Sequence, residues 1–289
     1  MIRTVSAGAL ASLVLLCAGV PARAAGNPSP FDATQVFFNQ QISGFTNDGG
    51  LYGPWYVQTL GARTHVGHDL PGIDLVFRQD HDPIGPSSGQ ELVLDDYRDW
   101  TPSFFSYGQV TTGGGPVFPT RSAYLEGDEK LGSRKQYALG AGAGIIDNAD
   151  GVIQRYLSLG PSYYWPTGNA LFRWVPSWTQ GVEGDGAITF SALHGRNGQA
   201  TQSIELITGA QPPFLNSATI VLPGARTVQV TLDLHQWVAP LFGVELGAEY
   251  QHLYNRTGGA TIYVRRAFTL GLFYGSFTNV PIGSATGGR

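Results

Sequence analysis

The sequence predicts an all-β chain that folds as a transmembrane antiparallel β-barrel of about fourteen strands, with about twelve or sixteen as alternatives. Three observations predict this fold: strict apolar–polar alternation in a hairpin near the C-terminus, an N-terminal export signal, and an unusual composition. Charged residues make up 13% of the chain, against about 25% in soluble domains, and glycine is abundant. A secreted all-β carbohydrate-binding protein has a similar composition and stays as an alternative.

The hairpin lies between residues 227 and 250, and a short turn at 239–241 joins its two arms. Alternation with a period of two puts apolar side chains on one face of a strand and polar ones on the other. We expect the apolar face to contact lipid, and its members are Val228, Val230, Leu232, Leu234, Val244, Leu246 and Ala248. The opposite face is too polar for the core of a sandwich, so it predicts a wet barrel interior.

The interior of the predicted barrel carries ionisable residues from several strands. We expect Glu126, Arg173, Glu205, Asp233, His235, Glu245, Glu249 and Arg265 to face it. Gly140, Gly142 and Gly144 occupy the same face of their strand, where the interior is expected to be crowded. The side chains of a barrel with about eight strands fill its interior, whereas a barrel of about sixteen strands leaves an aqueous channel. A barrel of about fourteen strands lies between these cases. We favour a filling network of ion pairs and hydrogen bonds over a selective channel.

The N-terminus predicts export. A basic segment, an apolar run from Val5 to Val20 and an Ala-x-Ala site indicate a signal peptide over residues 1–24. Cleavage would remove two of the 17 basic residues and none of the 21 acidic ones, changing the formal net charge from −4 to −6. It would also remove Cys17, the single cysteine. We expect a flexible lead-in over 25–33, a barrel over 34–277 and a flexible tail over 278–289.

The connections between strands indicate an orientation. Those after even-numbered strands are mostly short, and those after odd-numbered strands include the long ones, among them Asp80 to Gly89. Short turns in the periplasm and longer loops outside are typical of outer-membrane barrels, so we expect a periplasmic N-terminus. Tryptophans near the proposed turns are expected in the interfacial girdles, and these are Trp55, Trp100, Trp165, Trp178 and Trp237.

Two clusters of residues suggest chemistry, and neither is strong. His65, His68 and Asp69 lie close in sequence, but two histidines three apart on a strand point to opposite faces, so we expect no metal. Asp80, His81 and Asp82 are weak catalytic candidates, because flanking carboxylates orient a histidine as a base. We expect no cofactor, and the acidic balance argues against a nucleic-acid partner. Enzymatic activity stays uncertain, with a non-enzymatic role favoured.

The region from Glu91 to Gly151 resembles the YaiO family of outer-membrane β-barrels. The resemblance depends on strand and turn patterns, which are Asp96-Tyr97, Tyr107-Gly108, Phe118-Pro119, Ala123 to Leu131 and Leu139 to Gly144. It implies a bacterial outer-membrane location, contact with membrane lipids, and insertion helped by periplasmic chaperones and the barrel assembly machinery. It also implies a non-enzymatic surface barrel or narrow pore, associated with surface polysaccharide export or assembly. A rim-site enzyme acting on lipid or peptide is the alternative.

Overall fold

The computed structural model describes residues 33–82, 85–180, 184–195, 199–210 and 225–277. The predicted signal peptide, most of the lead-in and the predicted tail lie outside this part of the chain. Fourteen strands form within it. They are β1 (Ala33–Thr46), β2 (Trp55–Arg63), β3 (Asp69–Asp82), β4 (Gly85–Asp99), β5 (Phe104–Gly114), β6 (Arg121–Leu131), β7 (Tyr137–Asp147), β8 (Ile153–Trp165), β9 (Gly168–Thr179), β10 (Asp185–Gly195), β11 (Ala200–Ala210), β12 (Ala225–Ala239), β13 (Phe242–Asn255) and β14 (Thr261–Phe277).

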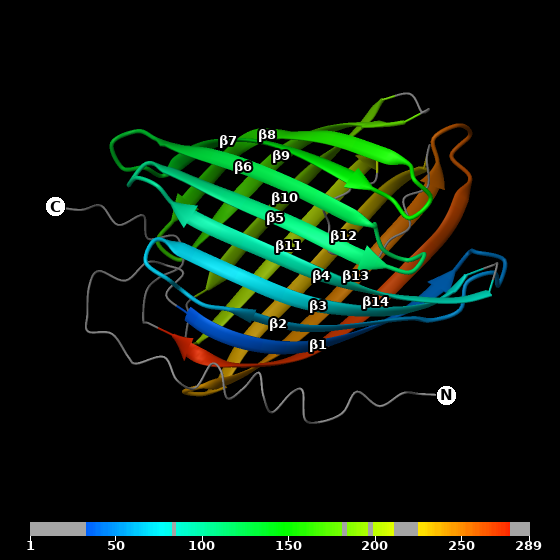
Figure 1. The fold of residues 1–289 in the computed structure, drawn as a ribbon, viewed down its shortest axis with the longest axis horizontal. Helices are drawn as coiled ribbons and strands as arrows, with labels where there is room; N and C mark the ends of the chain where they lie inside the picture. Colours follow the sequence, from blue (N-terminus) through cyan, green and yellow to red (C-terminus); the bar gives the residue numbers. More distant parts are fainter. Residues whose placement is uncertain (1–32, 83–84, 181–183, 196–198, 211–224, 278–289) are drawn as a thin grey trace.

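Every strand pairs antiparallel with its sequence neighbours, and β1 pairs with β14, so the sheet closes into one barrel (Figure 1). The closing pair is long, with register from Ala33 opposite Phe277 to Thr46 opposite Val264. Closure gives each of the fourteen described strands a partner on both sides, which is what a sheet needs in a medium that offers no hydrogen bonds. The ends of β3 and β4 at the odd rim extend past their partners β2 and β5. The predicted fold class is therefore confirmed. No helix long and apolar enough to cross a membrane occurs among the described residues.

The two ends of the barrel differ in their connections. We call the end with the connections after odd-numbered strands the odd rim, and the opposite end, where β1 begins and β14 ends, the even rim (Figure 1). The connections at the even rim include 132–136 and 240–241, and those at the odd rim include 47–54 and 115–120. The interior therefore has two mouths with different surroundings.

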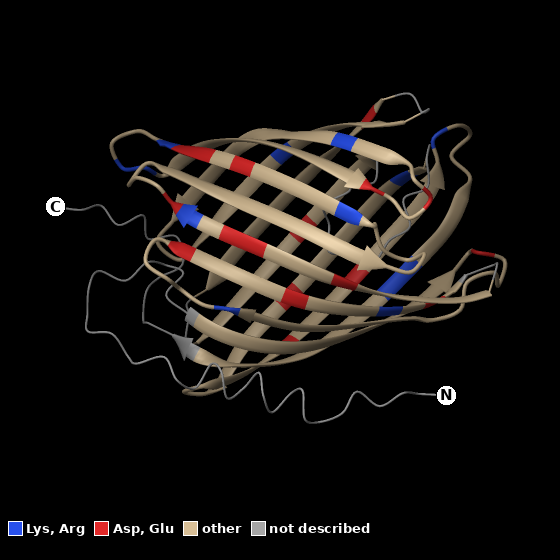
Figure 2. Ribbon diagram, in the orientation of Figure 1, with Lys and Arg blue, Asp and Glu red and all other residues tan. Residues whose placement is uncertain are grey.

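The outer wall is apolar over most of its area. On β14 the outward residues Phe268, Leu270, Leu272 and Tyr274 are each about half exposed, at 46–55%. The residues between them point inward, and Phe273 is only 2% exposed. Figure 2 shows charged residues in the middle of several strands as well as near the strand ends. The buried charged residues are Asp74, Arg78, Asp80, Asp128, Arg173, Glu249 and Arg265. The alternation predicted from the sequence is thus a separation of lipid face and interior.

Two local predictions are wrong. Asp80 to Gly89 was expected as a loop, but β3 continues to Asp82 and β4 starts at Gly85, with register from Asp80 opposite Ser87 to Asp82 opposite Gly85. The charged residues of this segment are typical of a loop in sequence. Asp80 nevertheless points into the barrel, where it is 1% exposed beside Arg78.

The other error concerns tryptophan. Trp100 and Trp178 are about half exposed on the outside, but Trp55 is 1% exposed inside the barrel. Trp237 also contacts the interior residue Phe273, with ring centroids 4.8 Å apart. A tryptophan at a strand end reaches either the girdle or the mouth of the interior, and its position in the two-residue period decides which.

The face assignment predicts unequal effects of one substitution at neighbouring positions. Leu232 is 49% exposed on the outer wall, and Thr231 points inward opposite Glu249 and Glu205. Leu232→Arg should cost about 2–4 kcal/mol because it places a charge against the hydrocarbon. Thr231→Arg should be mild, because acidic side chains surround it. Urea titration of vesicle-reconstituted protein, followed by the gel shift of the unboiled barrel, measures both. Equal destabilisation would contradict the assignment.

Candidate functional site

The barrel interior is the candidate functional site, because inward positions from all fourteen strands line it. The structure places the seven residues expected to contact lipid on the outer wall; Leu232, Leu234 and Leu246 are 38–49% exposed there. The eight residues expected inside all occupy inward positions of their strands. They do not form one network, however: Glu126 and Arg173 belong to one group, and Glu249 and Arg265 belong to a second. Asp233, His235 and Glu245 line a cavity, and Glu205 lies opposite Thr231.

The first group surrounds Arg173 on β9. Its guanidinium donates hydrogen bonds to Glu126 (2.8 Å) and Asp128 (2.9 Å) on β6, and to the carbonyl oxygens of Gly160 and Pro161. Asp128 was not among the expected interior residues. Arg173 is 6% exposed and Asp128 is 3% exposed, so both charges are buried. A buried pair depends on such saturated hydrogen bonding to offset the cost of leaving water.

Strand β7 makes room for this group because three successive inward residues are glycines. A Cβ at Gly140 would lie 2.6 Å from the Arg173 guanidinium, and one at Gly144 would lie 2.2 Å from the Tyr156 ring. A Cβ at Gly142 would meet the Tyr124 hydroxyl at 2.7 Å. Tyr124 and Tyr156 stack on each other with ring centroids 5.6 Å apart. The interior beside the middle of β7 is therefore filled by side chains, in keeping with the crowding expected there.

The second group lies near the odd rim along β1–β3 and β12–β14, and we call it the mouth cluster: Phe45, Tyr52, Trp55, Arg78, Asp80, Glu249, Leu253, Tyr263 and Arg265. The guanidiniums of Arg78 and Arg265 lie 4.5 and 5.5 Å from the centroid of the Trp55 ring. Asp80 pairs with Arg78 at 2.6 Å, and Glu249 pairs with Arg265. Two cations, each paired with a carboxylate, thus enclose one indole, and Trp55 is 1% exposed.

Two connections at the odd rim support the mouth cluster. Asp48 in the connection 47–54 accepts hydrogen bonds from the backbone N–H groups of Tyr52 (2.8 Å) and Gly50 (3.3 Å). These donors, Tyr52 first, hold the pKa of Asp48 below its usual range. In the connection 115–120, Val117 and Phe118 are buried, and Arg78 donates to the carbonyl oxygen of Val117 at 3.5 Å. The second connection therefore folds into the barrel.

A cavity of about 590 Å³ lies in the interior. Its lining includes 116–119 and 148–150 at the odd rim, and also Gln35, His235 and Phe273, which lie toward the even rim. It therefore extends along most of the barrel. Its ionisable lining residues are Asp74, Glu91, Asp150, Asp233, Glu245, Arg63, Arg78 and His235. Carboxylates exceed guanidiniums in this set.

The two arginines of the cavity are already engaged by carboxylates. Arg63 donates to Asp74 and Asp95, at 3.2 Å each, and Arg78 belongs to the mouth cluster. On the opposite wall, His235 lies 3.6 Å from Glu245, and Asp233 accepts a hydrogen bond from Ser203 at 3.4 Å. Amide and hydroxyl side chains fill much of the remaining lining, among them Asn39, Gln41, Thr59, Gln109, Thr111 and Thr269. The cavity is therefore polar, with an excess of negative charge.

The weak catalytic candidates do not come together. Asp80 points inward and is held by Arg78, whereas His81 is exposed, because successive residues of a strand point to opposite faces. Asp82 ends β3, and its side chain lies outside the described residues. No group of three or more His, Cys, Asp and Glu side chains close enough to hold a metal ion occurs among the described residues.

The model of the YaiO membrane beta barrel domain family matches residues 34–213. No protein among those with curated descriptions matches the sequence. A TodX deltaS2S3 mutant monoaromatic hydrocarbon channel superposes with a TM-score of 0.51 at 9% identity, covering 85% of this chain and 90% of that one.

Two further solved structures are similar in fold. The Pseudomonas putida toluene transporter TodX gives a TM-score of 0.47 at 9% identity, covering 85% of this chain and 89% of that one. A bacterial polysaccharide outer membrane secretin gives 0.46 at 11% identity, covering 84% of this chain and 98% of that one. Of these three, only the first has a TM-score above 0.5, and at 9% identity it is evidence for the fold alone.

The Arg173 group predicts a large effect of removing one cation. Arg173→Gln leaves Glu126 and Asp128 buried without their partner, which should cost about 3–5 kcal/mol. Arg121→Gln is the matched control: Arg121 pairs with Asp147 at 3.0 Å, but its side chain is 76% exposed, so the loss should be at most about 1 kcal/mol. The measurement is the urea midpoint of unfolding in vesicles. Adding Glu126→Gln and Asp128→Asn to Arg173→Gln should restore much of the stability, and equal midpoints for the two single variants would contradict the account.

Proposed function

We propose a non-enzymatic, pore-like role for this chain, which belongs to the YaiO membrane beta barrel domain family. The barrel is a bacterial outer-membrane protein, and lipid surrounds its apolar wall. The observation that carries the proposal is the polar cavity, which extends from the connections at the odd rim toward His235 and Phe273 near the even rim. A cavity of this shape is suited to passage rather than to chemistry at one point.

The proposed pore is narrow because side chains fill part of the interior. The Arg173 group and the stacked tyrosines occupy the side along β5–β9, and the mouth cluster narrows the odd rim. Fourteen strands leave less room than the sixteen or more of wide porins. We therefore propose that small hydrophilic solutes pass and large ones do not.

The lining also favours certain solutes. Asp74, Asp233 and Glu245 contribute negative charge to the cavity, and its arginines are already paired with carboxylates. The resulting negative electrostatic potential favours the passage of cations. The many amide and hydroxyl side chains are suited to hydrogen bonding with sugar hydroxyl groups. We therefore extend the proposal to association with a surface polysaccharide, through binding of short glycan segments in the cavity.

The proposed orientation puts the N-terminus and the even rim in the periplasm, in keeping with the long connections at the odd rim. We also propose that periplasmic chaperones and the barrel assembly machinery insert the chain. The closing pair β1–β14 supports this, because it unites the first and last strands and can form only after the whole chain has been made. Phe273, Tyr274 and Phe277 near the end of β14 are the aromatic residues available as an insertion signal.

The proposal predicts a cation-preferring conductance. Purified protein in a planar bilayer under a KCl gradient should give a reversal potential with the sign expected for potassium. Asp233→Asn together with Glu245→Gln should lower the ratio of cation to anion permeability by about twofold or more, because both carboxylates line the cavity. Asp147→Asn, outside the cavity lining and paired with exposed Arg121, is the control and should change nothing.

The same recording tests the glycan part. A short, neutral dextran oligosaccharide should reduce the current, and Asn39→Ala with Gln41→Ala should raise the concentration needed. A barrel that never conducts, or one that prefers anions, would contradict the pore. A conducting barrel that dextran leaves unaffected would contradict only the association with glycan.

A further inference from the structure

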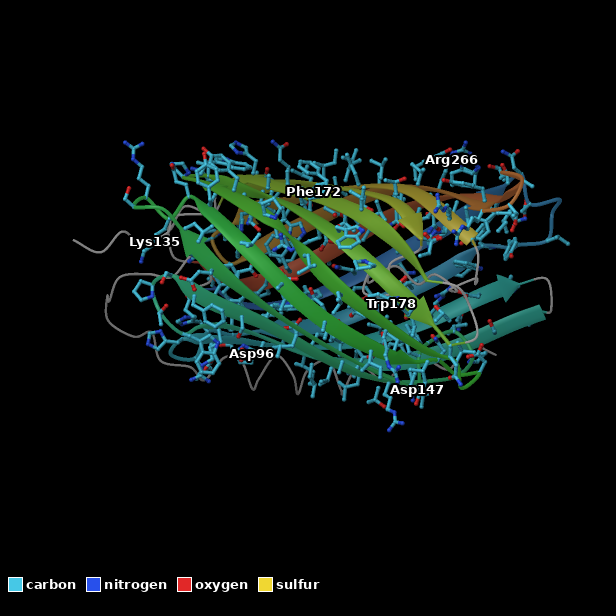
Figure 3. The ribbon with its side chains drawn as sticks, turned by 90° about the horizontal axis from the view of Figure 1, so that it is seen from above. Asp96, Lys135, Asp147, Phe172, Trp178 and Arg266 are labelled. Carbon is cyan, nitrogen blue, oxygen red and sulfur yellow. The ribbon has the colours of Figure 1, made fainter. Side chains whose placement is uncertain are left out.

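Two adjacent arginines of β14 point to opposite faces of the wall. Arg265 lies inside and is fully buried with Glu249 and Trp55. Arg266 is exposed on the outer surface, where Figure 3 labels it. Among the described residues, none forms a hydrogen bond or an ion pair with the Arg266 guanidinium. A cation on the lipid side of a barrel is unfavourable unless it reaches the headgroup region and an anion there.

The surroundings of Arg266 leave space for such an anion. On one side it lies opposite Gly44 of β1, and on the other opposite Tyr250 of β13. Gly44 also faces outward, and a Cβ built there would meet no atom within 4 Å, so the wall is recessed beside the guanidinium. Tyr250 is 42% exposed, and a tyrosine at this level is typical of the membrane interface. Arg266 thus has an open recess on one flank and a hydroxyl-bearing ring on the other.

An apolar groove of about 520 Å³ begins two residues along the strand from Arg266. Phe268 of β14 starts it, and the next outward residues in register are Ala248, Leu232, Ile204 and Ala192 on β13, β12, β11 and β10. The groove crosses the wall toward Ala192, near the even-rim end of β10. Alanines at two of these positions lower the surface between leucine and isoleucine side chains, so the groove is long and narrow.

We propose that Arg266 and this groove form a binding site for one lipid with an anionic phosphate headgroup. The guanidinium binds the phosphate, with the geometry that arginine offers to phosphate oxygens, and an acyl chain lies in the groove over Ala248 and Leu232. The charge and the groove are independent features of the outer wall, and a phospholipid needs both at about the separation of two residues in a strand, ~7 Å. With the N-terminus in the periplasm, the headgroup lies in the outer leaflet. The site does not depend on the proposed pore.

The test compares two lipids that differ only in headgroup. The barrel is reconstituted with equal amounts of phosphatidylglycerol and phosphatidylcholine of the same chain length, and retained lipid is counted by native mass spectrometry. Wild-type protein should retain phosphatidylglycerol preferentially, because choline already balances the phosphate of the other lipid. Arg266→Gln should lower the retained phosphatidylglycerol about fivefold or more, and Arg266→Lys should keep much of it.

Arg121→Gln is the matched control, since it removes an exposed arginine on β6 that is already paired with Asp147. It should leave retention unchanged, as should an excess of inorganic phosphate, because free phosphate cannot fill the groove. Ala248→Phe should fill the groove and lower retention while leaving Arg266 in place. Equal retention of both lipids by wild-type protein, or unchanged retention in Arg266→Gln, would overturn the proposal. Displacement by inorganic phosphate would overturn the acyl part of it.

Discussion

The need to satisfy every backbone hydrogen bond without water determines the rest of this structure. Hydrocarbon offers no donors or acceptors, so a sheet in a membrane must close on itself. The pairing of β1 with β14 meets this need, and it fixes the face of every residue through the two-residue period. Arg265 and Arg266 illustrate the consequence: adjacent in sequence, one is buried with Glu249 and the other is exposed on the lipid side.

Because the wall is closed, the inward side chains must pack within a limited volume. On one side, glycines provide the space for large side chains. The inward glycines of β7 admit Arg173, Tyr124 and Tyr156, which fill the interior beside them. Near the odd rim, Trp55 lies between two compensated arginines, and the connection 115–120 folds against them. The remaining space is a polar cavity whose carboxylates outnumber its guanidiniums, and residues of β5–β9 also line part of it. A barrel of this strand number therefore combines a filled side with an open one, which is what the proposed narrow pore requires.

Much of the fold was predictable because alternation is a local property of the chain. The strand number, the closed architecture and the face of each residue in the hairpin 227–250 follow from it. The ion pairs were not predictable, since Arg173 and its partners Glu126 and Asp128 lie 47 and 45 residues apart and meet only through the stagger of the strands.

Asp80 looked like a loop residue because charge was taken as a sign of exposure, although its partner Arg78 lies two positions away on the same face. The prediction that Trp55 lies in the interfacial girdle was wrong for a related reason. A position near a strand end does not determine whether the side chain points outward or inward. Arg266 stands out in the sequence because it lies in phase with the outward residues Phe268 and Leu270. The groove beside it, which supports the proposed lipid site, is visible only in the folded barrel.

Closure between β1 and β14 is the claim on which this account depends, and it can be measured directly. A mature chain without Cys17 has no cysteine, so Phe38→Cys and Leu272→Cys, which lie opposite each other on the outer wall, can be paired without competition. Facing positions in an antiparallel pair have Cα atoms about 4.5–5.5 Å apart, within reach of a disulfide. Mild oxidation in membranes should link them in high yield and shift the denatured band on a gel. Phe38→Cys with Leu246→Cys on β13 should stay unlinked. Linkage of this second pair, or failure of the first in a folded barrel, would contradict the closed fourteen-stranded structure.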